Sequence, residues 1–254
     1  MQMPITGPHL KLAAHVRACQ VDGPADAKSN AQVILLDLHQ NRYLGIGGSA
    51  VKVLAGQVKG FPGHCESPAI CAESTTIAAT DTLTQRLITL GMLTHNSCTL
   101  PHDDPFPIQS EEATASLEHN MEQPKLTVRK IGNLLASAAV AAWWLRWRSL
   151  HWIASAVAAR RDQLKVPPPD SSDAMKISIA AYEALRPFAF TARDRCLHDS
   201  LALVSFLATE GLRAHWVIGV RANPFAAHSW VQSGHTVLND SHEHVRQFRP
   251  ILFI

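Results

Sequence analysis

Residues 196–240 read CLHDSLALVSFLATEGLRAHWVIGVRANPFAAHSWVQSGHTVLND and carry the clearest structural pattern of the sequence. Its first part, up to Gly211, is apolar around most of a helical circumference, which predicts a buried helix with the glycine at its C-cap. The pattern then changes to runs typical of strands, at 215–220, 226–232 and 235–240, and a final run, ILFI, ends the sequence. We therefore expect a helix packed on an antiparallel sheet.

Two residues of this stretch, Cys196 and His228, suggest thiol chemistry. Cys196 falls in or just before the first turn of the predicted helix, with Asp194 as a candidate N-cap, and unpaired backbone N–H groups there favour a thiolate. His228 lies on a predicted strand, where it could pair with the thiolate and later protonate a leaving amine. The chain holds 14 histidines, so the bland alternative is a chance pairing in which Cys196 is an ordinary core residue.

A third group must fix the tautomer of His228, and Asn239 and Asp240 are the two candidates. Opposed residues of an antiparallel hairpin share a face, so the loop length decides between them. A two-residue loop, Ser233-Gly234, places His228 opposite Asn239. A three-residue loop, 233–235, places it opposite Asp240. The spacing alone leaves both open.

Helices are also predicted ahead of this stretch, at 127–147, 149–164 and 172–186, the last of them ended by Pro187. The longest apolar run, Ile131 to Leu145, has 15 residues. A membrane span needs roughly 20. We interpret this run as a buried helix.

Tryptophans crowd the end of the first of these helices. At 100° per residue, Trp143 and Trp147 lie about 40° apart, whereas Trp144 is turned about 100° from Trp143. We expect one face to pack into the core. We expect the other to meet a second surface, which is the N-terminal domain, a partner protein or, least favoured, a membrane.

The N-terminal block predicts a compact unit of small strands followed by helices. Strands are expected near 11–16, at 31–38 and at 41–46, the last two forming a hairpin, and helices at 49–57 and 80–93. This is an α+β unit of winged-helix type. The polar, proline-containing segment 96–125 is interpreted as a linker.

Composition excludes several classes of protein. The chain has 254 residues, 46% of them hydrophobic and 17% charged, which is enough for a sizeable core. A net charge of +2 and the lack of a basic block argue against a nucleic-acid binder. Five cysteines without paired spacing, and an N-terminus without a signal-peptide pattern, favour a reducing cytoplasm.

Other chemistries find little support in the sequence. A zinc site from His64, Cys65, Cys71 and Cys98 fits no standard ligand spacing. Ser200 lacks the glycine-flanked elbow of a serine hydrolase. No phosphate-binding or dinucleotide-binding glycine motif is present. We therefore expect neither a cofactor nor a metal.

The stretch quoted above resembles the core of the lasso-peptide biosynthesis B proteins, which are transglutaminase-like cysteine peptidases. The matching motifs are Cys-Leu-x-x-Ser-Leu-Ala-Leu at 196–203, Gly-Val-Arg at 219–221, Pro-Phe-x-Ala-His-x-Trp-Val at 224–231 and Asn-Asp at 239–240. The resemblance implies Cys196 as nucleophile, His228 as base and Asp240 as the orienting acid, which favours the three-residue loop. The sequence departs from the family pattern after His228, where Ser-Trp-Val-Gln at 229–232 stands in place of the Ala-Trp-Val-Glu that the family often has.

The stretch LLDLHQNRYLGIGGSAVKVL resembles the PqqD-like leader-recognition domains, with Asp37 and Tyr43 in matching places. In that family a leader peptide adds as a strand beside the third strand and packs on the third helix. The implied leader-binding residues are therefore Arg42, Tyr43, Leu44 and Ile46 on the strand, and Leu83, Arg86 and Leu87 on the helix. For each leucine alone, a pure core role is the alternative.

Together these patterns predict two domains: 1–95 for leader recognition and 126–254 as the transglutaminase-like, papain-like peptidase, joined by 96–125. The expected function is removal of the leader from a lasso-peptide precursor. The resemblance implies an asparagine-synthetase-like cyclase as partner, and nucleic acid and membrane are not expected partners. A true transglutaminase-like acyltransferase and a non-catalytic scaffold remain the alternatives.

Overall fold

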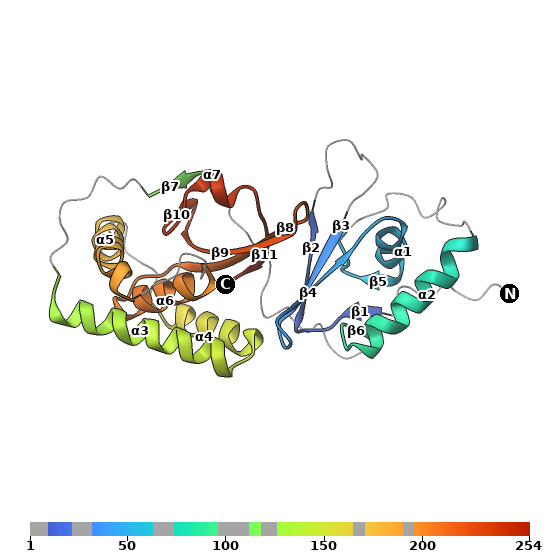
Figure 1. The fold of residues 1–254 in the computed structure, drawn as a ribbon, viewed down its shortest axis with the longest axis horizontal. Helices are drawn as coiled ribbons and strands as arrows, with labels where there is room; N and C mark the ends of the chain where they lie inside the picture. The colour runs from blue at the N-terminus through green and yellow to red at the C-terminus, as the bar shows by residue number, and fades with distance from the viewer. Residues whose placement is uncertain are drawn as a thin grey trace. The chain divides into compact units, whose positions relative to one another are not determined.

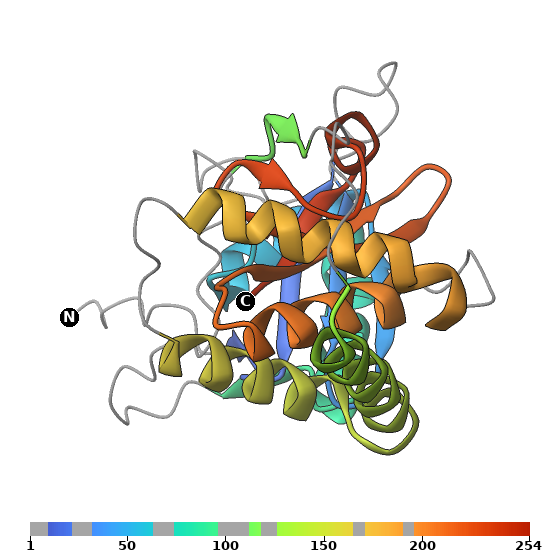
Figure 2. The same cartoon turned by 90° about the vertical axis from the view of Figure 1, so that its left-hand side faces the viewer.

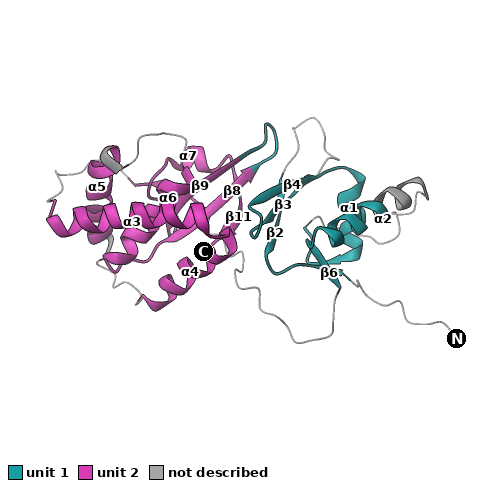
Figure 3. Cartoon of the chain, turned by 60° about the horizontal axis from the view of Figure 1, so that its bottom comes forward, with its two compact units in different colours: residues 1–105, 221–226 teal, residues 106–220, 227–254 magenta. Residues whose placement is uncertain are grey.

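The chain divides into two compact units, seen in a computed structural model. The first comprises residues 1–105 with 221–226, and the second residues 106–220 with 227–254 (Figure 3). The structure describes residues 10–21, 32–62, 74–95, 112–117, 126–164, 171–189 and 196–254. Each unit has a sheet of its own, so each is described by itself.

The first unit contains a three-stranded antiparallel sheet in the order β2 (Val16–Val21), β3 (Gln32–Asp37) and β4 (Arg42–Ile46). The predicted β3–β4 hairpin is confirmed, and its turn contains Asn41 with φ 51°. The strand expected near 11–16 is wrong in its limits. A turn closed by the Val16 N–H on the Ala13 carbonyl separates β1 (Leu10–Leu12) from β2.

Two helices and a second small sheet complete this unit. The small sheet has the order β5 (Val58–Lys59), β1, β6 (Leu93–His95). The helix α1 (Ser49–Gln57) has the predicted limits, whereas α2 (Ser74–Thr89) begins six residues earlier than predicted and ends before Gly91, whose φ is 72°. The buried core is shared by the sheets and helices and includes Val33, Leu35, Leu54, Leu87 and Leu93. The α+β class expected for this block is therefore confirmed.

The second unit is built on a five-stranded sheet in the order β11-β8-β9-β10-β7 (Figure 1). The strands are β7 (Ala115–Ser116), β8 (His215–Arg221), β9 (Ala226–Ser233), β10 (Thr236–Val237) and β11 (Arg249–Phe253). The β7–β10 pair is parallel, and the β9–β10 and β8–β11 pairs are antiparallel. Part of the segment interpreted as a linker thus supplies a strand of this sheet.

Helices lie against this sheet, as Figure 2 shows for α5 and α6. The helices are α3 (Val128–Trp147), α4 (Leu150–Gln163), α5 (Ser171–Ala189), α6 (Cys196–Thr209) and α7 (His242–Val245). The side chain of Ser200 on α6 bonds to Ser229 on β9, and His198 on the same helix bonds to the Ala138 carbonyl of α3. The helix that begins with Cys196 is therefore held between the sheet and α3.

The expectation that Pro187 ends its helix is wrong, because α5 continues to Ala189 with this proline inside it. Proline lacks an N–H and crowds the carbonyl four residues earlier. In the last turn of a helix this interrupts few further hydrogen bonds. Pro187 was predicted to end the helix, but the last turn of α5 accommodates it.

The hairpin after His228 has a register that neither expected loop describes. Ser233 pairs with Thr236, and Gln232 with Val237, so the loop is Gly234-His235. Gly234 occupies the first loop position with φ 55°, in the left-handed region that glycine adopts at little cost. The strand expected over 235–240 is also shorter than predicted. Its regular part, β10, ends at Val237, so Asn239 and Asp240 lie beyond it.

The helix α3 is only half buried, which corrects the expectation for residues 131–145. Leu134 and Ala141 face the core, whereas Leu135, Trp143 and Trp147 are 51%, 50% and 66% exposed. The expectation of burial is wrong for the outer face of the helix, where these apolar residues are exposed to solvent. Within the described ranges, no helix is both long enough and apolar enough to cross a membrane.

The tryptophans at the end of α3 divide between the two environments. Trp144 is partly buried and meets Trp152 of α4 edge-on, with ring centroids 5.3 Å apart. The guanidinium of Arg148 lies over the rings of Trp143 and Trp152. Trp143 and Trp147 therefore present an exposed aromatic surface, while Trp144 belongs partly to the packing of this unit.

Replacing Gly219 by alanine is expected to destabilise the second unit. An added Cβ on β8 would lie 2.7 Å from the ring of Trp230 and 2.9 Å from the Cβ of Phe248. Such overpacking lowers the free energy of unfolding by about 2–3 kcal/mol. Urea unfolding of the full chain measures this change. The control is Gly132→Ala on α3, where the added Cβ meets open space and a small gain in stability is expected. An equal response of the two variants would contradict the prediction.

Candidate active site

The first residue of α6 is Cys196, which is a free, partly buried cysteine. A hydrogen bond to His228 is the main cause that lowers the pKa of its thiol, opposed by burial and helped by the imidazole charge and by the backbone N–H groups of Ser229 and Leu197. These contacts favour a thiolate. The predicted N-cap, Asp194, lies outside the described residues.

The strand β9 carries His228 between this thiol and a carboxylate. Its Nε2 lies 2.6 Å from Oδ2 of Asp240. An ionised carboxylate only accepts hydrogen bonds, so Nε2 carries a proton and Nδ1 is left for Cys196. Burial alone would lower the pKa of His228, but the hydrogen bonds and charges of Asp240 and Cys196 raise it to about 9. The imidazole is therefore held as an imidazolium at neutral pH.

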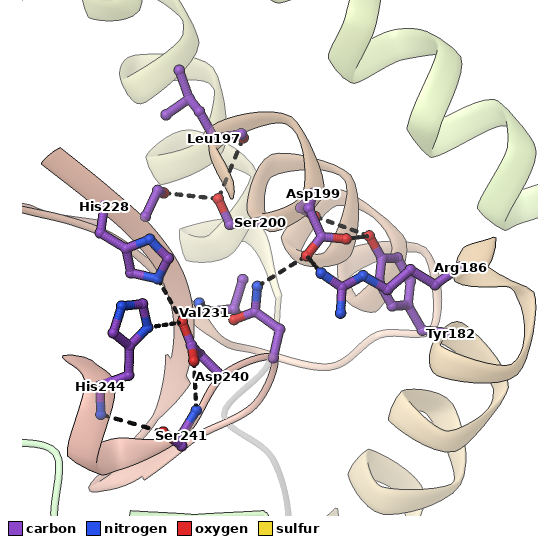
Figure 4. Close-up of polar contacts among 12 residues, drawn as sticks. Tyr182, Arg186, Leu197, Asp199, Ser200, His228, Val231, Asp240, Ser241 and His244 are labelled. Carbon is purple, nitrogen blue, oxygen red and sulfur yellow. Dashed lines mark hydrogen bonds and ion pairs between the residues drawn. The ribbon is translucent and has the colours of Figure 1, made fainter. Parts of the chain in front are cut away.

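Asp240 lies just beyond β10 and receives three hydrogen bonds (Figure 4). The backbone N–H of Ser241 donates to Oδ1 at 2.7 Å, and Nδ1 of His244 lies 2.9 Å from Oδ2, the oxygen that also bonds to His228. Burial raises the pKa of Asp240, but these donors together lower it to about 2. The carboxylate is thus ionised throughout the neutral range.

The neighbouring candidate, Asn239, serves the backbone instead of the imidazole. Its Oδ1 accepts from the N–H of Val231 at 2.8 Å, taking the place of a strand partner where β10 has ended. Its Nδ2 donates to Oδ2 of Asp199 at 3.4 Å. Of the two residues that the sequence left open, Asp240 is the one that contacts His228, and Asn239 anchors the loop that carries it.

Asp199, one turn into α6, is a buried acid that joins three elements. Its Oδ1 accepts from the hydroxyl of Tyr182 at 2.9 Å, and its Oδ2 lies 2.9 Å from Nη2 of Arg186, both on α5. With Asn239 on the same oxygen, Asp199 ties α5, α6 and the Asp240 loop together (Figure 4). Sequence reasoning missed this role. An acid in the first turn of an otherwise apolar helix was the available signal.

A second buried network fixes α6 to the sheet behind the site. The hydroxyl oxygens of Ser200 and Ser229 are 2.7 Å apart, and Nε1 of Trp216 donates to Ser200 at 3.0 Å. Ser229 also donates to the carbonyl of Val217 at 2.9 Å. Because these groups satisfy one another, they hold Cys196 and His228 on two elements that are directly bonded.

Aromatic rings form one wall of the site. The imidazole of His228 stacks near Trp230, with centroids 6.1 Å apart, and near Phe248 at 5.2 Å. His244 also packs against Phe248. Sequence reasoning missed Phe248 and His244, since His244 lies in the four-residue helix α7 and Phe248 follows it, and so short a helix produces no periodic pattern.

Among the described residues, His228, Asp240 and His244 are the one group whose ligand atoms, within 4.8 Å of one another, could hold a metal ion. A metal would have to displace the proton that the raised pKa of His228 keeps on this imidazole. The four residues considered for zinc, His64, Cys65, Cys71 and Cys98, lie outside the described residues.

The implied leader-binding residues lie on two elements of the first unit. On β4, Arg42 is exposed, Tyr43 and Leu44 are half-buried, and Ile46 is buried. On α2, Arg86 is exposed, Leu83 is half-buried and Leu87 is buried. Ile46 and Leu87 therefore belong to the hydrophobic core of this unit.

Comparison with known proteins finds a family model and a relative to which parts of this chain are similar. Residues 135–253 match the family model of the transglutaminase-like superfamily. Over 49 residues the chain is 50% identical to the Microcin J25-processing protein McjB of Escherichia coli, a stretch that is 19% of this chain and 24% of that protein. The chain thus matches about a quarter of the length of this curated relative. No solved structure matches the chain. The superfamily match includes the elements that carry Cys196, His228 and Asp240.

Proposed function

We propose that this chain, which carries a transglutaminase-like domain over residues 135–253, is a cysteine peptidase that removes the leader from a lasso-peptide precursor. The observation that carries the proposal is the continuous chain of contacts from Cys196 through His228 to Asp240. The similarity to a microcin J25-processing protein supports a ribosomal peptide as substrate.

The proposed reaction begins with the thiolate of Cys196. Its sulfur adds to the carbonyl carbon of the scissile bond, and the resulting oxyanion accepts a hydrogen bond from the backbone N–H of Cys196. The C–N bond then breaks while His228 gives its Nδ1 proton to the leaving amine of the core peptide. This step leaves the leader as a thioester on the sulfur. The neutral imidazole next takes a proton from water, whose oxygen adds to the thioester carbonyl carbon. The C–S bond then breaks, which restores the Cys196 thiolate and releases the leader as a carboxylic acid that gives its proton to solvent.

Leader recognition is proposed for the first unit. Among the strands that the structure describes, β4 pairs with β3 alone and so offers a free edge. An extended peptide can add to such an edge through backbone hydrogen bonds. The exposed or half-buried members of the implied set, Arg42, Tyr43, Leu44, Leu83 and Arg86, are available for side-chain contacts. The buried Ile46 and Leu87 would support that surface from beneath.

Binding of the leader is expected to protect the β4 amides from hydrogen exchange. Strand addition forms backbone hydrogen bonds along the outer edge of β4, so exchange of the amides that join these bonds should slow about tenfold or more. Exchange is measured on the full chain carrying Cys196→Ala, with and without a synthetic leader peptide. The amides of α3 serve as the internal control. Unchanged exchange in β4 under saturating leader would contradict strand addition at this edge.

A transglutaminase-like acyltransferase is the second candidate, because the superfamily match fits transfer of the acyl group to an amine as well as to water. The two reactions share the thioester and differ in what resolves it. Incubation of the full chain with a precursor peptide and a competing primary amine separates them by mass spectrometry. A free leader carboxylate is expected, and a leader carrying the added amine as sole product would favour the acyltransferase. An uncut precursor that still binds would favour the scaffold.

The freed amine of the core peptide needs a consumer. We propose an ATP-using, asparagine-synthetase-like cyclase as the partner that joins this amine to a side-chain carboxylate, as the family resemblance implies. A reducing cytoplasm is the proposed location, because a catalytic thiolate requires a free cysteine and Cys196 is free in this structure.

A further inference from the structure

We propose that His244 is a positioning residue that holds Asp240 in the orientation His228 requires. The inference rests on the proposed function, since it gives a role in the same site to a residue outside the thiol–imidazole–carboxylate chain. Nδ1 of His244 lies 2.9 Å from Oδ2 of Asp240. Because the carboxylate accepts, the proton of this hydrogen bond belongs to His244.

The local fold explains why residue 244 returns to residue 240. Ser241 is the N-cap of α7, and its Oγ accepts from the backbone N–H of His244 at 3.2 Å. The cap turns the chain into one short helical turn, which brings residues four apart to the same side. Asp240 and His244 therefore meet through a turn that Ser241 itself stabilises.

Three donors then determine how the carboxylate lies. Ser241 N–H fixes Oδ1 at 2.7 Å, while His228 and His244 share Oδ2 at 2.6 and 2.9 Å. Without His244, one neutral N–H and the catalytic imidazole would be left to orient a group that is 23% exposed. A carboxylate that turns towards solvent supports the imidazolium less well, and the thiolate of Cys196 then loses part of its stabilisation.

The surroundings of His244 suit a positioning role better than direct chemistry. Its side chain is 45% exposed, against 15% for His228. Its ring packs edge-on against Phe248 and lies 4.7 Å from the ring of His228. Among the described residues, the titratable groups recorded in contact with His228 are Cys196, Asp240 and His244. We therefore assign to His244 an effect on Cys196 that passes through Asp240 and His228.

Two substitutions separate the hydrogen bond from the packing. His244→Asn keeps an N–H donor near the place of Nδ1 and loses the ring. His244→Phe keeps a ring against Phe248 and loses the donor. We expect His244→Phe to lower kcat about tenfold with KM within about twofold, and His244→Asn to retain most of the activity. The matched control is His242→Asn on the same helical turn. His242 bonds to Ser116 and not to Asp240, so this substitution is expected to leave kcat unchanged.

A measurement without the precursor keeps this test apart from the proposed function. Iodoacetamide alkylation of Cys196, followed by mass spectrometry of its peptide, reports the thiolate as a function of pH. In His244→Phe the rise of alkylation should shift to higher pH, and in His244→Asn it should stay near that of the unmodified chain. In the Asp240→Asn background, His244→Phe should add no further shift, because the role of His244 passes through Asp240.

Each contrary outcome is decisive for the inference. Rescue by phenylalanine instead of asparagine would assign His244 to packing. A shift of alkylation to lower pH in His244→Phe would show that His244 competes with His228 for Oδ2, and would overturn the positioning role. An additive shift in the Asp240→Asn background would do the same. If the alkylation shifts are as expected but the unmodified chain does not cleave the precursor, the result would count against the proposed function and would still support the role of His244.

Discussion

Replacing Cys196 by alanine is expected to abolish leader cleavage and to leave the fold intact. Loss of the nucleophile in a hydrolase triad costs several orders of magnitude, so we expect at least about a 10⁴-fold loss of rate. Alanine is a good helix former, and Cys196 is only partly buried at the start of α6. Mass spectrometry of the precursor incubated with the variant measures the loss.

The other cysteine that the structure describes, Cys19, provides the matched control. Cys19 lies on β2 in the first unit, and Cys19→Ala should cleave the precursor at the rate of the unmodified protein. Far-ultraviolet circular dichroism of both variants checks the fold. Cleavage by Cys196→Ala at a rate close to that of Cys19→Ala would exclude the proposed mechanism.

Replacing Asp240 by asparagine is expected to lower kcat about 10³–10⁴-fold. Asparagine is close to aspartate in size but carries no charge, and such variants of hydrolase triads stabilise the wrong tautomer of the histidine. Asn239→Ala is the comparison, with a milder loss expected, because Asn239 bonds to Val231 and Asp199. Rates of precursor cleavage at saturating substrate measure both. A loss in Asn239→Ala that equals the loss in Asp240→Asn would contradict these roles.

Asp240→Asn should also narrow the range of pH over which the precursor is cleaved. The proposed reaction requires a thiolate at Cys196 and an imidazolium at His228, so its rate should fall above the pKa of about 9 at His228. Asp240 raises that pKa, so its loss should move the alkaline limb to lower pH. The weaker imidazolium should also raise the pKa of Cys196 and move the acid limb to higher pH. A pH profile of kcat/KM tests both directions, and an unchanged alkaline limb would count against the His228–Asp240 pair.

The elements that the sequence predicted well are those with strong, long patterns. The helix α6 and the strands β8 and β9 lie where their apolar runs indicated, because burial on nearly all sides leaves few alternatives. The β3–β4 hairpin in the first unit was equally clear. These elements alone place Cys196 and His228 on a helix and a strand that pack together.

The details that escaped prediction depend on single positions. The hairpin register differs from both expected registers because the loop is Gly234-His235, with Gly234 at its first position. Both expected loops began at Ser233 instead. His244 reached Asp240 through a four-residue helix, which is too short to leave a periodic signal. The exposure of α3 escaped because an apolar run of that length reads the same whether one of its faces is covered or not.

The stacking of Trp230 near His228 gives the site an optical reporter of its own. Indole emission is quenched by a neighbouring imidazolium more strongly than by neutral imidazole, so the fluorescence of Trp230 should brighten as His228 loses its proton. Of the six tryptophans, Trp216 and Trp230 are buried, whereas Trp143, Trp147 and Trp152 are exposed. Iodide in solution would therefore suppress much of the unrelated emission, and the signal that remains would follow the protonation of His228 without any added label.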